Sequence, residues 1–199
     1  MTDRTLDHLV VTAPTTDTGA AWVEARLGVR PGPGGVHDRM GTHNRLLSLG
    51  PSAYLEVIAV NPAAPAPGRP RWFGLDELSP TAEPRLAAWV CRTTDIGAID
   101  GKPGPVETMT RGSLTWLITV PPDGRSPFDG AGPLFIQWQT DPPPAATLPD
   151  LGCRLLRFEV THPHPETLGP VGGVEVQRGE AALRAIIDTP AGPRVISSR

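Results

Sequence analysis

The sequence predicts an α+β fold made of two βαβββ modules and a C-terminal β extension. The order of strand, helix and further strands occurs twice in the 199 residues, and a proline-rich segment at residues 61–84 separates the two occurrences. The hexapeptide TTDTGA at residues 15–20 returns as TTDIGA at residues 93–98, with a single change. We therefore expect a duplicated module within one domain that spans residues 1–199.

Residues 5–60 form the expected first module. Thr15, Thr16 and Asp17 can supply the N-cap of a helix with an apolar inner face, and Gly28 ends that helix. Residues 31–35 form a turn-like loop of glycine and proline, without the strand-to-helix context of a phosphate-binding loop. Strands are predicted from their apolar and β-branched residues at 6–11, near Val29, at 43–49 and at 54–60.

The second module is expected at residues 85–140, after a surface crossover at residues 61–84 where repeated prolines prevent regular structure. Its predicted elements are strands at residues 86–92, 106–110, 113–120 and 134–139, with a short capped helix start at 93–98. The C-terminal β extension covers residues 150–199. Its alternating runs at residues 155–161, 174–177 and 182–188 predict a β-meander that extends or caps the second module.

Composition narrows the class of protein. The formal net charge of −3 and the scattered basic residues give no basic face for nucleic acid. No apolar run approaches the length of a membrane helix and no secretory signal is visible, so we expect a cytoplasmic protein with no membrane partner. Cys91 and Cys153 lie in apolar strand-like runs and are expected to be buried free thiols. Abundant arginine, alanine and proline suggest a bacterial source.

Four segments carry a resemblance to a known family: LDHLV at residues 6–10, MGTHN at 40–44, YLEVIA at 54–59 and RWFGLD at 71–76. They resemble the glyoxalase-like family of the vicinal oxygen chelate (glyoxalase/bleomycin resistance/extradiol dioxygenase) superfamily. The resemblance implies that the paired modules form a cupped, partly open barrel around a ligand site. It also implies a divalent metal (Zn, Ni, Mn, Fe or Mg) held by His, Glu or Gln of the first and last strands, and a homodimer.

The residues support part of this site. Strand alternation places Leu6, His8 and Val10 on one face, and Tyr54, Glu56 and Ile58 on one face of the later strand. A buried imidazole and a buried carboxylate each need a partner, so His8 and Glu56 can pair with each other, bind a metal or contact a polar ligand.

The second module offers weaker donors for a metal. The position that matches His8 falls on Ala88 or Trp89, and the position that matches Glu56 falls on Gln137. The metal set expected from the resemblance is therefore His8, Glu56 and Gln137, with His43 as an alternative fourth ligand. His162 and His164 alternate with prolines and are expected in a surface loop.

Two functions follow from these candidates. In the first, His8 and Glu56 are catalytic residues of a metal-dependent lyase, isomerase or oxygenase that acts on a small oxygenated metabolite. In the second, the chain is a metal-free protein that binds or sequesters a small molecule or antibiotic. The residues expected to contact the bound molecule are His43, Asn44, Tyr54, Arg71 and Trp72.

Overall fold

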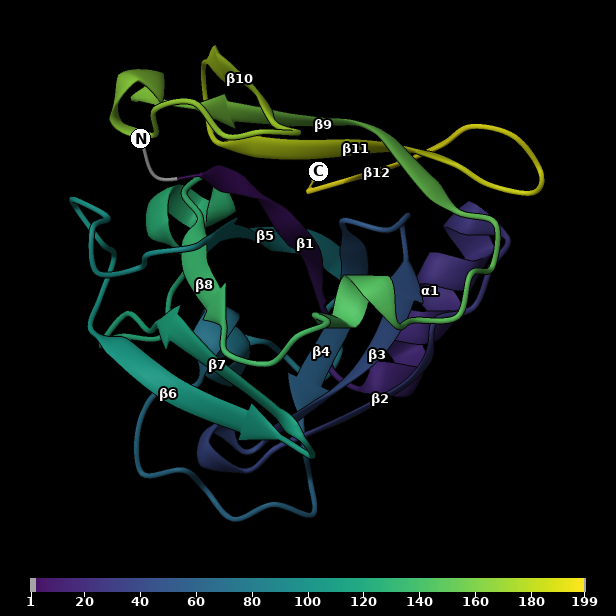
Figure 1. Cartoon of the computed structure of the whole chain (residues 1–199). Coiled ribbons are helices and arrows are strands. Elements are labelled where there is room, and N and C mark those ends of the chain that lie inside the picture. The colour runs from purple at the N-terminus through teal and green to yellow at the C-terminus, as the bar shows by residue number, and fades with distance from the viewer. Residues whose placement is uncertain (1–2, 199) are drawn as a thin grey trace.

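The computed structural model describes residues 3–198, and an eight-stranded sheet curled into a barrel is its framework (Figure 1). The strands lie in the order β2-β3-β4-β1-β5-β8-β7-β6. Their bounds are β1 (Arg4–Thr12), β2 (Gly32–His37), β3 (Thr42–Ser48), β4 (Tyr54–Val60), β5 (Arg85–Thr93), β6 (Val106–Arg111), β7 (Leu114–Thr119) and β8 (Leu134–Trp138). Short 3₁₀ helices lie at Asp38–Met40, Trp72–Glu77, Pro127–Gly130, Pro144–Ala146 and Pro165–Thr167.

The strand order confirms the duplicated architecture. Within each half, the first strand pairs in parallel with the last, β1 with β4 and β5 with β8, while β1 and β5 join the halves as an antiparallel pair. The edge strands β2 and β6 then approach each other without forming a ladder. Side chains close this seam: Arg39 donates to the Thr108 carbonyl at 2.6 Å, and Glu107 pairs with Arg39 and Arg69 at 2.9 and 2.7 Å. The barrel is therefore cupped and partly open, as predicted.

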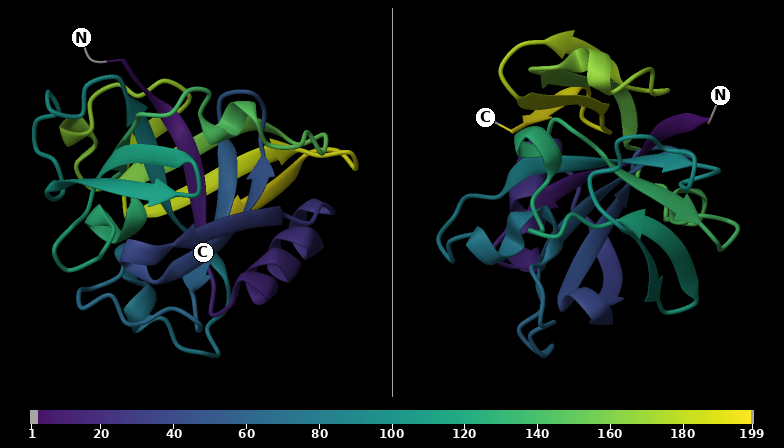
Figure 2. Two further views of the ribbon diagram at one scale, coloured as in Figure 1. Left: turned by 60° about the horizontal axis from the view of Figure 1, so that its bottom comes forward. Right: turned by 90° about the vertical axis from the view of Figure 1, so that its left-hand side faces the viewer.

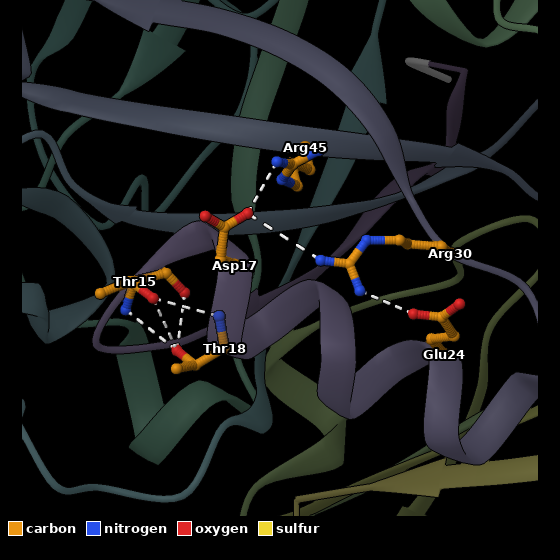
Figure 3. Close-up of polar contacts among 6 residues, drawn as sticks. All are labelled: Thr15, Asp17, Thr18, Glu24, Arg30 and Arg45. Carbon is orange, nitrogen blue, oxygen red and sulfur yellow. Dashed lines mark hydrogen bonds and ion pairs between the residues drawn. The ribbon is translucent and has the colours of Figure 1, made fainter.

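Helix α1 (Thr16–Leu27) covers the outer face of the first module. Thr15 and Thr18 form a reciprocal capping box, and Gly28 ends the helix in the left-handed conformation (Figure 3). Asp17 pairs with Arg45 of β3 at 2.7 Å, which ties the first turn to the sheet. These caps confirm the start and the end predicted for this helix.

Two segments differ from the sequence-based expectation. A helix start is expected at residues 93–98, but residue 93 ends strand β5 and residues 94–98 form a turn. The Asp95 carboxylate stabilises this turn because it accepts hydrogen bonds from the backbone N–H groups of Gly97 and Ala98. The glycine- and proline-rich segment expected to be a loop contains strand β2, which pairs with β3 across an irregular register at residues 33–36. An edge strand tolerates proline because its outward N–H groups need no ladder partner.

The C-terminal extension forms a second sheet, of β9 (Arg154–His162), β10 (Glu175–Arg178), β11 (Ala182–Asp188) and β12 (Arg194–Ser197), in the order β10-β9-β11-β12. The β-meander expectation is wrong, because β10 runs parallel to β9. The sheet lies across the outside of the barrel over β1, β5 and α1 (Figures 1 and 2). It therefore covers both modules, and it does not cap the second alone.

Two hydrophobic cores flank the central strands. Leu9, Trp89 and Phe158 belong to the core beneath the second sheet, whereas Val10 and Val90 belong to the core inside the barrel. A register shift between Leu6 and His8 turns Leu6 toward the first core, so the expectation that Leu6 shares a face with His8 is wrong. The free cysteines Cys91 and Cys153 are both buried, as predicted. Among residues 3–198, no helix has the length and apolar character needed to cross a membrane.

Candidate functional site

A cavity inside the barrel gathers the polar residues of β1 and β4. It holds about 340 Å³ of space free of atoms, part of it open to solvent. Both modules contribute to its lining, which is formed by His8, His37, Tyr54, Glu56, Trp72, Phe73, Arg111, Trp116, Ile118, Ile136 and Trp138. A polar end from the first module thus faces a mainly aromatic and aliphatic wall from the second.

Asp7, His8 and Glu56 form a chain of three buried groups at this polar end. His8 Nδ1 lies 2.7 Å from Asp7 Oδ1, and His8 Nε2 lies 3.6 Å from Glu56 Oε2. Because a carboxylate only accepts hydrogen bonds, the contact with Asp7 places the proton on Nδ1. His8 Nε2 is therefore directed at Glu56 and the cavity, and both side chains are less than one-tenth exposed.

Asp7 is itself held in place by the second module. Trp138 donates its indole N–H to Asp7 Oδ2 at 2.9 Å, and Arg92 lies 3.5 Å from the same oxygen. Tyr54 stacks on the His8 ring with centroids 4.6 Å apart. Burial, and then the nearby carboxylates of Asp7 and Glu56, raise the pKa of Tyr54 well above its ordinary value, so its phenol stays protonated.

Asn44 orients the Glu56 carboxylate from β3. Its amide nitrogen donates to Glu56 Oε1 at 2.5 Å and lies 3.5 Å from His37 Nε2, while its amide oxygen accepts the Gly35 N–H at 2.8 Å. A Cβ on Gly34 would lie 2.1 Å from the Asn44 amide oxygen. The glycines of β2 thus allow its backbone to approach Asn44, and Glu56 Oε2 is the carboxylate oxygen left to face His8.

His37 is a neutral member of the same group. Its Nδ1 lies 3.0 Å from the Thr42 hydroxyl, which also accepts the Trp72 indole N–H at 3.2 Å. Burial, followed by the charge of Arg111, lowers the pKa of His37 to about 3. Its ring packs in T-shaped geometry against Trp72 and Trp116, and His37 is neutral at neutral pH.

The structure brings together some of the sequence-predicted site residues and separates others. Tyr54, Glu56, His8 and Trp72 line the cavity, and Asn44 bonds to Glu56. The other three lie elsewhere. His43 lies on the opposite face of β3, beside Arg45, and Arg71 pairs with Asp76 at 2.5 Å. The Gln137 amide oxygen accepts the Ile96 N–H at 2.9 Å.

Asp7, His37 and Arg111 are functional candidates that the sequence analysis missed. Asp7 directly precedes His8 in the LDHLV segment, and this position next to a candidate site residue was the signal in the sequence that could have identified it. His37 and Arg111 end the two edge strands, and their approach depends on closure of the barrel across the seam. No spacing in the sequence links those two positions.

The paired modules, the curled sheet and the central cavity define a barrel of the vicinal oxygen chelate class. Residues 6–170 match the glyoxalase-like domain family, and the chain belongs to that family within this superfamily. No curated protein matches the sequence.

Three solved structures are similar to this chain, and the first of them shares its fold. A hypothetical protein from Staphylococcus aureus aligns with a TM-score of 0.60 and 15% identity, over 89% of this chain and 87% of its own. The methylmalonyl-CoA epimerase of Mycobacterium tuberculosis gives a TM-score of 0.43 and 20% identity, over 69% and 89% of the two chains. A Streptomyces coelicolor methylmalonyl-CoA epimerase in complex with 2-nitronate-propionyl-CoA gives 0.46 and 19%, over 69% and 97%.

Superfamily members commonly bind divalent metals, and the donors in this barrel fit such an ion poorly. His8 Nε2 and Glu56 Oε2 face each other, but the neighbouring positions of β8 that line the cavity are Ile136 and Trp138. Across residues 3–198, no three side chains of His, Cys, Asp or Glu are grouped so that they could hold a metal. A zinc site in a protein normally supplies three or four such ligands.

Proposed function

We propose that this chain binds a small oxygenated metabolite in the barrel and moves a proton on it, in a reaction of the lyase or isomerase kind. The observation that carries the proposal is the 3.6 Å separation of His8 Nε2 from Glu56 Oε2 inside the cavity. Two buried groups of this kind, each able to take or give a proton, suit general acid–base catalysis.

The contacts of each group assign its role. Asn44 occupies Glu56 Oε1, so Oε2 is the oxygen that removes a proton from the carbon next to a carbonyl or hydroxyl group. Asp7 fixes the proton on His8 Nδ1 and stabilises the imidazolium that forms when Nε2 also carries one. Nε2 takes up the proton from Glu56 Oε2, which lies 3.6 Å away, and then donates it to the oxygen or to the neighbouring carbon, so that both groups return to their starting states. Glu56 and His8 are the catalytic residues, and Asp7 and Asn44 position them.

The aromatic wall supports the same reaction. Trp72, Trp116 and Trp138 also line the cavity, where they bury a flat or apolar part of the ligand and exclude water. A dry cavity strengthens the electrostatic interactions between the ligand and the Glu56–His8 pair.

A second candidate function is metal-free binding that sequesters the small molecule. The aromatic wall favours this function, because stacking surfaces bind flat ligands without any chemistry. The two candidates differ in whether the protein exchanges carbon-bound protons of its ligand with solvent.

The test is exchange of carbon-bound hydrogen in deuterated water, followed by NMR with pyruvate, 2-oxobutyrate and hydroxyacetone as probes. We expect the protein to accelerate deuterium uptake next to the carbonyl of at least one probe. Glu56→Gln and His8→Gln should each reduce this acceleration by roughly 100-fold or more, the scale of lost general acid–base catalysis. His164→Gln is the matched control, because His164 is exposed and lies outside the cavity.

Two further results separate the alternatives. Binding of the probes without any exchange would reject proton transfer and leave sequestration. The metal content of the purified protein tests whether the side chains in the cavity can hold an ion. We expect no stoichiometric zinc, nickel, manganese, iron or magnesium, because His8 and Glu56 are the only two donors that face each other there among the described residues. Stoichiometric metal that is lost with His8→Ala would contradict the metal-free mechanism.

A further inference from the structure

Among residues 3–198, Arg111 is the one lysine or arginine that lines the cavity. It ends β6, on the side of the barrel contributed by the second module. Within residues 3–198 it forms no ion pair, whereas the other arginines close to the seam and the site do: Arg39 and Arg69 pair with Glu107, and Arg92 pairs with Asp7. A half-buried guanidinium beside a cavity normally has an anionic partner, and the described part of the chain supplies none here.

Gly35 on the opposite edge strand makes room for this side chain. A Cβ at Gly35 would lie 2.7 Å from Arg111 Cδ and 2.8 Å from Arg111 Cγ. The Gly35 backbone is outside the left-handed region, so its conformation does not require glycine. The glycine instead lets the arginine stem cross the seam and reach the cavity.

The surrounding charges leave Arg111 as the fixed cation of the cavity. His37, the nearby histidine, is held neutral by burial and by the charge of Arg111 itself. The carboxylates of Asp7 and Glu56 lie at the polar end and are engaged by His8, Asn44 and Trp138. A ligand with one anionic end therefore finds a free guanidinium in the same cavity as the acid–base pair.

We propose that Arg111 binds the carboxylate of the substrate, which is a small oxo- or hydroxy-carboxylate. This inference rests on the proposed function, and it names the class of molecule on which the Glu56–His8 pair acts. The carboxylate lies at Arg111, the apolar part lies against Trp116 and Trp138, and the reacting carbon lies toward Glu56. A planar guanidinium offers two parallel N–H donors to a carboxylate, which gives both affinity and orientation.

The test compares carboxylates with their neutral amides of the same shape. Acetate, pyruvate and benzoate are each titrated against acetamide, pyruvamide and benzamide, and tryptophan fluorescence reports binding because three tryptophans line the cavity. We expect at least one carboxylate to bind about tenfold or more tightly than its amide, in line with a charge-assisted pair. Arg111→Gln should abolish this preference, and Arg111→Lys should restore part of it.

Two more variants separate recognition from folding. Arg85→Gln is the matched control: Arg85 also forms no ion pair among the described residues, but it lines a different hollow beside Thr12. It should keep the full carboxylate preference. Gly35→Ala leaves every charge in place and displaces the Arg111 stem, so it should weaken carboxylates more than amides. Circular dichroism on each variant identifies any that does not fold.

The outcomes distinguish this inference from the proposed function. Equal binding of carboxylates and amides, unchanged in Arg111→Gln, overturns the role of Arg111 while the cavity remains a binding site. A carboxylate preference that depends on Arg111, without deuterium exchange, supports Arg111 and rejects the catalytic proposal. Binding of none of the six probes at millimolar concentration overturns both.

Discussion

His8 and His37 both line the cavity, but the residues around them give the two imidazole rings different properties. His8 has a carboxylate on each side of its ring, Asp7 at Nδ1 and Glu56 at Nε2, so each ring nitrogen faces a group that can accept a proton. His37 lies among Thr42, Asn44 and two tryptophan rings, where a positive charge has no partner. One imidazole is therefore suited to proton transfer and the other to a fixed neutral hydrogen-bonding role.

The neutrality of His37 predicts how stability depends on pH. Its pKa is about 3 in the folded protein and 6.5 ordinarily, so between these values the unfolded chain binds a proton that the folded chain excludes. The free energy of unfolding should therefore fall as the pH falls from 6.5 toward 3, by up to about 1.4 kcal/mol per pH unit from this residue. Above pH 6.5 both states are neutral at His37 and its contribution is constant.

Urea denaturation between pH 4 and 7.5 measures this slope. His37→Gln should give a shallower fall in the free energy of unfolding than the unaltered chain. His164→Gln should keep the original slope, since His164 is exposed beside Glu166. Identical slopes for the two variants would refute the buried neutral histidine.

At the scale of elements, close approach of backbones explains several glycines. Gly34 and Gly35 let β2 approach Asn44 and Arg111, and Gly19 lets α1 pack on β4. A Cβ on Gly19 would lie 2.4 Å from Val57 Cγ1 and 2.8 Å from Ala13 Cβ. Tertiary packing therefore overrides the preference of a helix interior for alanine.

Gly19→Ala tests this packing. On helix propensity alone the change would stabilise the protein by about 1 kcal/mol. Because the added methyl group overpacks the interface with Val57, we expect a net loss of roughly 1–2 kcal/mol in the free energy of unfolding. A Val57→Ala background removes the contact with Cγ1 and keeps the one with Ala13 Cβ, so Gly19→Ala should cost less stability there than in the unaltered chain. A gain in stability in the unaltered chain would show that helix and sheet lie farther apart.

At the scale of the whole molecule, the second sheet completes the hydrophobic core on the outside of the barrel. Phe158 of β9 packs its ring 5.7 Å from that of Trp89 on β5, and both are fully buried. Their core also contains Leu9 of β1 and Leu27 of α1. The outer faces of the central strands are thus covered by residues from the C-terminal extension.

Phe158→Ala should therefore destabilise the entire chain. We expect a loss of about 3–5 kcal/mol in the free energy of unfolding, as for other buried phenylalanines, in one cooperative transition. Leu156→Ala in the same strand is the control, with an effect within about 0.5 kcal/mol because Leu156 is 57% exposed. Calorimetry that shows two transitions, with only the later residues affected, would indicate that the second sheet unfolds independently.

Local sequence predicted those features whose causes are local. Strands β1, β4 and β11 and helix α1 follow from apolar periodicity and from caps such as Thr15 and Gly28. His8 and Glu56 stood out because polar groups on apolar strands need partners. The strand β2 was not predicted from its glycines and prolines, since its pairing with β3 comes from tertiary contacts.

The sequence by itself determined the duplicated modules and the family, because strand patterns and short segments such as LDHLV depend only on residues that are close together in the chain. Only the tertiary structure decided which residues share the cavity. The seam brings His37 and Arg111 to the site, and strand alternation places Ile136 and Trp138 in the cavity while Gln137 bonds to Ile96. Which side chains meet depends on the closure of the curled sheet and on the face each strand turns inward, and both are set by packing between distant segments.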